Sequence, residues 1–137
     1  MNVRFAIFSS LILLSAASFC SARQRSSSKI KITDSGYVAA LSTANRFLNA
    51  WQVGDLETGT VLLSDRARRS QSADSLEKFF SRTPDRAFEI NHGKCERSGC
   101  RFPVVMLSEE SGRVHRKFSE IELVNNGKSD WAVDKVP

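Results

Sequence analysis

The chain has 137 residues, of which 41% are hydrophobic and 26% charged, and its formal net charge is +5 at neutral pH. This length supports one domain, and the apolar content is ordinary for a globular protein. The positive residues are scattered, apart from a short run at Arg66, Arg68 and Arg69. A nucleic-acid surface needs a basic stripe with interleaved aromatic side chains, so the composition argues against a nucleic-acid partner.

The first 22 residues have the pattern of a secretory signal peptide. A basic start over 1–4 precedes an apolar or small segment over 5–19, and Ala22 ends a run of small residues suited to cleavage. We expect a flexible serine-rich leader over 23–33, a secreted or periplasmic location, and no membrane contact beyond the signal peptide. An uncleaved anchor is one alternative, although the segment is short for a membrane span. A lipoprotein acylated at Cys20 is the other.

The mature domain, residues 34–137, is predicted to begin with a long amphipathic helix. Asp34 or Ser35 suits its N-cap, and Gly54 suits its C-terminal stop. Between these positions apolar residues recur at helical spacing and form one stripe. The members of the stripe are Tyr37, Val38, Leu41, Ala44, Phe47, Leu48 and Trp51. We expect this stripe to be buried against a sheet.

Two shorter helices are predicted to follow. Asp55 can cap the first of them, which would contain Leu56, Val61, Leu62 and Leu63. Ser72 or Asp74 can open the next one, and Pro84 ends it. Its apolar inner face consists of Leu76, Phe79 and Phe80.

After this helix the apolar period changes to two, which predicts four strands. The first strand, over 88–92, places His92 in phase with its apolar residues, and the second, over 102–107, is apolar on both faces. The third runs over 114–124 with a bulge between Phe118 and Ile121, and the last contains Trp131 and Val133. Turns at 109–112 and 125–127 give a four-stranded antiparallel meander. Helices followed by strands indicate the α+β class.

Two cysteines, Cys95 and Cys100, remain after signal cleavage, and they flank the turn between the first two strands. An even number of cysteines in an exported protein predicts a disulfide, here at a hairpin tip. A redox or metal site is the weaker alternative because four residues, not two, separate the pair. The only histidines, His92 and His115, are isolated, and His115 is expected at the surface. We therefore predict no metal site and no cofactor.

Two segments carry a family resemblance. The first helix ends with Phe47-Leu48-Asn49-Ala50-Trp51-Gln52-Val53-Gly54-Asp55, and the last strand contains Asp130-Trp131-Ala132-Val133. With this order of elements, residues 34–136 resemble the nuclear transport factor 2-like superfamily, which includes the ketosteroid isomerases. The resemblance implies a cone in which three N-terminal helices pack on a curved sheet and leave a pocket at the open end. It also implies that the outer sheet face can serve dimerisation.

The resemblance does not extend to the catalytic residues of the isomerases. Their oxyanion-binding tyrosine corresponds to Phe47, which has no hydroxyl to donate. Their catalytic base corresponds approximately to Gln71, which cannot take a proton at neutral pH. We therefore expect no isomerase activity of that type and assign no catalytic residue.

Together these features predict an exported, non-enzymatic binding or assembly domain that uses the pocket under the sheet or the outer sheet face. The pocket candidates are Tyr37, Phe47, Trp51 and His92, with a small apolar ligand. The strand that is apolar on both faces suggests a homodimer through the outer face. The alternative is an isomerase- or hydrolase-like enzyme with a pocket lined by Tyr37, Trp51 and His92, which needs at least two titratable side chains converging on a cavity.

Overall fold

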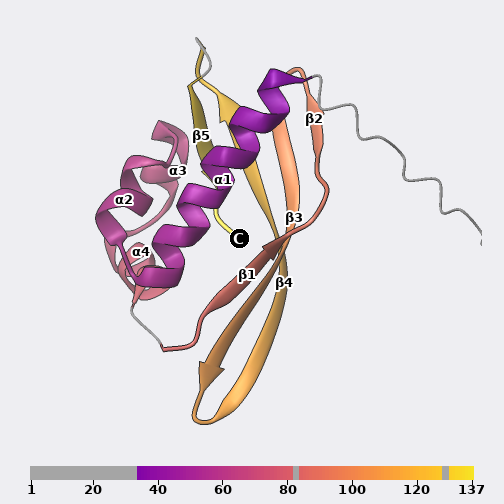
Figure 1. Cartoon of the computed structure of the whole chain (residues 1–137). Coiled ribbons are helices and arrows are strands. Elements are labelled where there is room, and N and C mark those ends of the chain that lie inside the picture. The colour runs from indigo at the N-terminus through magenta and orange to yellow at the C-terminus, as the bar shows by residue number, and fades with distance from the viewer. Residues whose placement is uncertain (1–33, 82–83, 128–129) are drawn as a thin grey trace, which may run out of the picture. The chain divides into compact units, whose positions relative to one another are not determined.

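The computed structural model describes residues 34–81, 84–127 and 130–137, and the predicted signal peptide and leader lie outside them. Within the described part the chain forms four helices followed by five strands (Figure 1). The helices are α1 (Ser35–Val53), α2 (Leu56–Val61), α3 (Asp65–Ser70) and α4 (Ala73–Phe80). The strands are β1 (Ala87–Ile90), β2 (Lys94–Glu96), β3 (Gly99–Glu110), β4 (Arg113–Asn125) and β5 (Trp131–Lys135). Over these residues, no helix combines the length and apolar character needed to cross a bilayer.

Helix α1 has the predicted caps. The Gly36 N–H donates to Asp34 Oδ1 at 2.9 Å, and Gly54 adopts the left-handed conformation with φ 74° that ends the helix. The apolar stripe is buried toward its C-terminal end, from Ala44 to Trp51. Val38, which we predicted in the stripe, is 47% exposed because it lies nine residues, or two and a half helical turns, before buried Phe47 and therefore on the opposite side of α1.

The sequence predicted two helices between α1 and the sheet, and the structure has three. Ser64 caps the additional helix, α3, by accepting a hydrogen bond from the Ala67 N–H at 3.0 Å. This helix has six residues and buries only Ala67, so it produces no apolar period. Asp55 and Ser72 cap α2 and α4 as predicted, and hydrogen bonds from Thr58 hold the pKa of the Asp55 carboxyl below its ordinary value.

The sheet is antiparallel with the order β1-β3-β4-β5, and β2 also pairs with β3. The predicted first strand over 88–92 corresponds to β1, which ends at Ile90, and β2 is a separate short strand that the sequence did not predict. At the break the Asn91 N–H donates to the Pro103 carbonyl at 2.9 Å, but proline has no N–H to donate back. His92 and Gly93 together then lie opposite Phe102, which is a bulge of one residue.

The bulge predicted between Phe118 and Ile121 is wrong. Register between β3 and β4 is continuous from Gly99–Val124 to Glu110–Arg113. The apparent slip arises because Phe118 belongs to the outer face of the sheet, where it is 72% exposed. The irregularity lies instead between β4 and β5, where Asp134 is the extra residue opposite the Glu122–Leu123 step.

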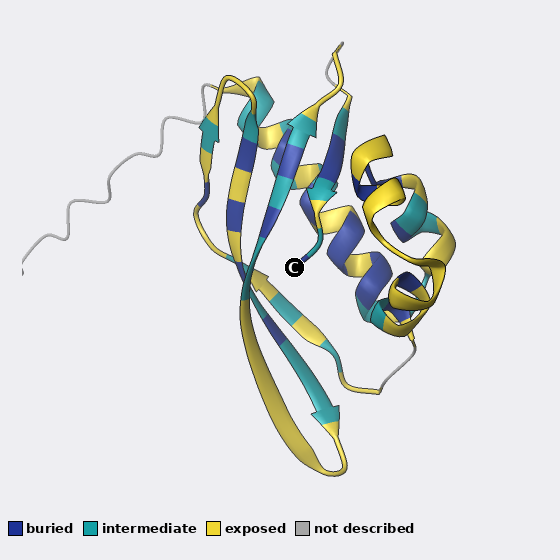
Figure 2. Cartoon of the chain, turned by 180° about the vertical axis from the view of Figure 1, so that it is seen from behind, coloured by how far each residue is buried: buried dark blue, intermediate teal, exposed yellow. Residues whose placement is uncertain are grey.

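The helices cover one face of a twisted sheet, and the buried residues gather between the two layers (Figure 2). We call the helix-covered face the inner face and the opposite one the outer face. The largest fully buried side chains are Phe47, Phe80, Phe102, Leu48, Leu63, Ile121 and Leu123. Strands β3 and β4 continue beyond the helices as a long hairpin (Figure 1). Ser111 and Gly112 form its tight turn with φ values of 54° and 74°.

The cysteine pair lies opposite one another across β2 and β3, with the two sulfur atoms within bonding distance. We expect the protein isolated under oxidising conditions to be two hydrogens lighter than its reduced form. Replacing both residues with serine should lower the free energy of unfolding by about 2 kcal/mol, because the ring that the bond closes is short. Intact mass and urea denaturation measure the two effects. Two freely reactive thiols in the oxidised, folded protein would contradict the assignment.

Candidate functional site

A pocket of about 640 Å³ lies on the inner face of the sheet. It is bordered by the C-terminal end of α1, by α4 and by the projecting half of the β3–β4 hairpin. Trp51, Phe79 and Met106 supply apolar surface, and we call these three side chains the apolar wall. The polar lining residues are Ser75, Lys78, Ser81, Arg86, Ser108, Glu109, Glu110, His115, Arg116 and Lys117.

Arg86 is fixed against the apolar wall. Its guanidinium carbon lies 4.7 Å from the centroid of the Trp51 ring, a cation–π geometry. Nη1 donates to the Trp51 carbonyl at 2.8 Å, while Gln52 Nε2 donates to the Arg86 carbonyl at 2.7 Å. Nε is buried without a hydrogen-bond partner, and burial lowers the pKa of Arg86 from its ordinary value. The end of α1 thus holds a partly desolvated positive charge at the pocket.

Further basic side chains come from α4 and β4. Lys78 lies in the last turn of α4, and the period-two alternation of β4 places His115 and Lys117 on the inner face together with buried Ile121. Lys117 Nζ donates to the Pro137 backbone oxygen at 3.2 Å. Over the residues that the structure describes, neither Lys78 nor Lys117 forms an ion pair with a carboxylate.

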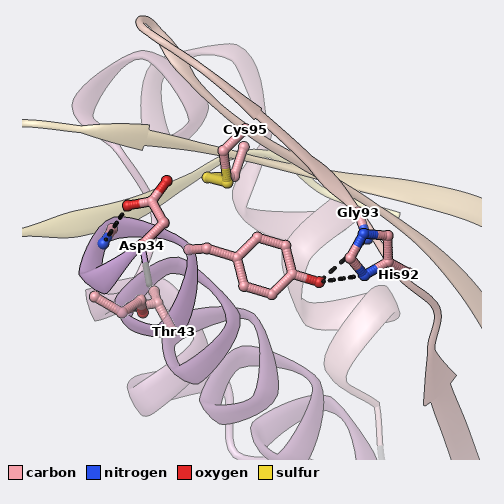
Figure 3. The surroundings of a disulfide bond; sticks show 9 residues. Asp34, Thr43, His92, Gly93 and Cys95 are labelled. Carbon is pink, nitrogen blue, oxygen red and sulfur yellow. Dashed lines mark hydrogen bonds between the residues drawn. A yellow bond between two sulfur atoms is a disulfide. The ribbon is translucent and has the colours of Figure 1, made fainter. Parts of the chain in front are cut away.

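The structure separates the four predicted pocket residues. Trp51 lines the pocket, while Phe47 lies behind it with no exposed surface, its ring 6.1 Å from that of Phe79. Tyr37 is fourteen positions before Trp51 on α1, so about 21 Å of helix separates them. Tyr37 instead meets His92, with 3.2 Å between the tyrosine oxygen and Nδ1 (Figure 3).

The Tyr37–His92 contact belongs to a second, more polar site. His92 lines a depression of about 410 Å³ together with Glu96, Arg101 and Glu120. Arg101 pairs with Glu96 at 3.3 Å, and the Gly93 N–H donates to the Tyr37 hydroxyl at 3.4 Å. No hydrogen bond within the described ranges joins His92 to a carboxylate. The contact therefore holds the start of α1 to the β1–β2 bulge, and in the described part of the chain the Tyr37 hydroxyl, not a carboxylate, orients the histidine.

A third polar cluster ties α3 to the sheet. Ser64 Oγ donates to Asp134 Oδ1 at 2.6 Å, and Arg66 forms a bidentate pair with the same carboxylate. The bulge in β5 leaves Asp134 as the unmatched residue of the strand. The Asp134 side chain is nearly buried, and both of its partners come from the α3 region. This cluster has a structural role, because the Ser64 hydroxyl that donates to Asp134 also accepts the hydrogen bond that caps α3.

Sequence reasoning missed Lys78, Arg86 and Lys117 as pocket residues. Each is a charged residue outside the apolar periods, and such residues are ordinarily solvated. Arg86 precedes β1 directly, and only the fold brings it onto Trp51. His115 is exposed, as expected, and it borders the pocket. Among the described residues no group of histidine, cysteine and carboxylate side chains could hold a metal ion.

Comparison with solved structures identifies the fold. The chain superposes on the designed protein "Rd1NTF2_04 with long sheet" with a TM-score of 0.55 and 14% identity, covering 69% of this chain and 94% of that one. A second design of that series, Rd1NTF2_05, gives a TM-score of 0.58 and 13% identity, covering 72% and 94%. The sequence matches no protein-family model and no curated protein. The fold is therefore nuclear transport factor 2-like, as the resemblance implied.

Proposed function

We propose that this chain is a binding domain whose pocket on the inner face of the sheet takes a small organic molecule. The observation that carries the proposal is the cavity of about 640 Å³ with one apolar wall and a rim of polar groups. Its volume falls within the range of small-molecule sites, which combine apolar walls with a few placed polar groups. The nuclear transport factor 2-like resemblance implies a pocket at the open end of the cone, and a cavity on the inner face of the sheet supports that expectation. Fold likeness alone does not select a ligand.

Binding is favoured over catalysis by the arrangement of the titratable groups. His115 borders the pocket, but within the described ranges no hydrogen bond links it to a carboxylate or a hydroxyl. An acid–base or nucleophilic site needs a base that is oriented by a partner. The alternative enzyme site built from Tyr37, Trp51 and His92 would require residues from both ends of α1 to converge.

A pocket-filling substitution tests the proposal. Ser108 and Leu107 are neighbours on β3, and only Ser108 lines the pocket. A set of aromatic and aliphatic fragments is screened through the indole N–H signal of Trp51 in proton–nitrogen correlation spectra. We expect Ser108→Phe to weaken the binding of every fragment that shifts this signal, and Leu107→Phe to leave the affinities unchanged. Fragments that bind equally well to both variants would place the binding site elsewhere.

The location of the domain is a further part of the proposal. We place it outside the cytoplasm, secreted or periplasmic, after removal of residues 1–22. The cysteine pair supports this location because disulfides persist in oxidising compartments.

A second candidate function is assembly through the outer face of the sheet. Val114 and Phe118 are each 72% exposed there, and Phe118 lies opposite Val105 in the β3–β4 pair. Large apolar side chains gathered on one exposed face often mark an interaction site. The proposed partner is a second copy of this chain.

We expect the protein to elute as a homodimer at high micromolar concentration, and Phe118→Lys to shift it to monomer by placing a charge in the apolar contact. Size-exclusion chromatography with light scattering measures both. Lys94→Glu, on β2, serves as a surface control that leaves the mass unchanged. A wild-type protein that is monomeric at such concentrations contradicts the dimer.

A further inference from the structure

The pocket on the inner face carries an excess of positive charge. Lys78, Arg86 and Lys117 line it, against Glu110. Arg116 and Glu109 also border it, but alternation places them on the outer face, where the Arg116 guanidinium carbon lies 5.8 Å from the Phe118 ring centroid. The four ion pairs that the structure records among the described residues all lie elsewhere. Among the described residues the positive groups of the pocket therefore form no ion pair with a side-chain carboxylate, although Lys117 donates a hydrogen bond to the Pro137 backbone oxygen.

Arg86 is the most constrained of these charges. The stacking on Trp51 and the hydrogen bond to its carbonyl restrain the guanidinium beside the apolar wall. A buried donor without a partner is unfavourable, and Arg86 Nε is such a donor. An anion held at the pocket side of the guanidinium would compensate its charge in a partly desolvated place, where charge pairing is stronger than in water.

The apolar wall lies beside these charges and indicates the rest of the ligand. Trp51 and Phe79 have ring centroids 6.3 Å apart, and Met106 adds a polarisable side chain from β3. Aromatic and thioether groups favour a flat apolar body over a hydrated one. Lys78 lies on α4 and Lys117 lies on β4. Positive charge therefore flanks the apolar wall from both the helix layer and the sheet.

We infer that the pocket selects an organic anion with a flat apolar body, such as an aromatic carboxylate, the body lying on the apolar wall and the carboxylate near Arg86, Lys78 and Lys117. This inference rests on the proposed binding function and adds the chemical class of the ligand. The inferred ligand differs from the small apolar ligand that the sequence suggested, because a neutral molecule would bring no negative charge to Arg86, Lys78 and Lys117.

Two isosteric probes test the inference on the full chain. Naphthalene-2-carboxylate and naphthalene-2-carboxamide share one ring system and differ in charge. The protein has two tryptophans, so the indole signal of Trp51 reports the pocket and that of Trp131, on β5, serves as an internal control. We expect the carboxylate to shift the Trp51 signal saturably and to bind about tenfold more tightly than the carboxamide.

Charge-removing variants locate the effect. Lys78→Gln combined with Lys117→Gln should weaken carboxylate binding about tenfold and leave carboxamide binding unchanged. The matched control, Lys94→Gln combined with Arg97→Gln, removes two positive charges from β2 and its turn and should change neither affinity.

The outcomes separate the inference from the function on which it rests. Equal affinity of the two probes at Trp51 overturns the anion selectivity and leaves a neutral-ligand pocket. A carboxylate preference that survives the lysine double variant overturns the assignment of the anion to these groups. Shifts confined to Trp131, or no shift from either probe, overturn both the inference and the proposed function.

Discussion

Replacement of Phe47 by alanine is expected to lower the free energy of unfolding by about 3–5 kcal/mol. The side chain has no exposed surface, and its ring stacks near Phe79 and meets Phe80 edge-on with centroids 5.5 Å apart. These contacts join α1 to α4. Removing the ring leaves a cavity that the rigid elements around it cannot fully close. Phe79 would also lose its contact with the Phe47 ring, so the side chains of the apolar wall should become more mobile.

Urea denaturation followed by circular dichroism measures this loss, with Val61→Ala on α2 as the control. An apolar side chain is removed there from a position that is 70% exposed and lies outside the proposed dimer face, and we expect a change of about 0.5 kcal/mol or less. Equal losses for the two variants would contradict the assigned core. A Phe47→Ala protein too unstable to fold would be compared with Phe47→Leu, which should retain the fold with a smaller loss.

Replacement of Gly99 by alanine is expected to destabilise the protein by about 3 kcal/mol. An added Cβ atom would overlap the carbonyl oxygen of Leu123 on the neighbouring strand. Because this oxygen belongs to the backbone, it cannot move aside as a flexible side chain would. The two strands would have to separate next to Cys100, where the disulfide restrains the hairpin.

Gly112→Ala is the control for this substitution. Gly112 has a φ of 74°, with no heavy atom within 4 Å of an added Cβ. The substitution therefore incurs backbone strain of about 1 kcal/mol without a clash. Thermal unfolding and the amide spectrum of β3 distinguish the two effects. A Gly99→Ala protein as stable as the Gly112→Ala protein would show that β3 and β4 can move apart here at little expense.

Local chemistry was the part of the fold that the sequence predicted well. The caps Asp34, Gly54, Asp55 and Ser72 are where the residue types placed them, because a capping side chain acts on its own first turn. The short helix α3 was missed because a helix with one buried residue has no period to detect. Its place is set by a distant contact, the hydrogen bond of Ser64 to Asp134.

In the sheet, as in the helices, local patterns were predicted well and features that depend on distant contacts were not. Alternation predicted that Phe102, Val104 and Met106 share one face of their strand, but it did not tell which of the two apolar faces is the inner one; in the structure these three residues are buried. The break after Ile90 depends on Pro103 lying directly opposite Asn91, and that register is not visible in either segment alone. The wrong bulge position followed from treating every apolar residue as inward-facing, although Phe118 faces outward.

Of the four candidate site residues, only Trp51 lines the main pocket. Tyr37 and Trp51 share one helical stripe, and a stripe tells which face is buried but not which positions along it meet the same cavity. The basic residues around the pocket come from three separate elements. Their convergence follows from how α4 and the β3–β4 hairpin pack, which the sequence pattern does not encode directly.

The projecting half of the β3–β4 hairpin has a consequence for the amide exchange of the pocket. Beyond Leu107, β3 pairs only with β4, and β5 pairs with β4 only from Glu122 to Asn125. A ribbon of two strands is marginally stable by itself. Its amides should therefore exchange through local opening, while the amides near Ile121 should exchange only through global unfolding. Ser108 and His115 lie in this ribbon, so we expect the least protected backbone of the sheet to border the proposed ligand site. A ligand that contacts both the ribbon and α4 would slow amide exchange in the ribbon first. Deuterium uptake by the ribbon would therefore report ligand binding at the segment whose amides are least protected in the free protein.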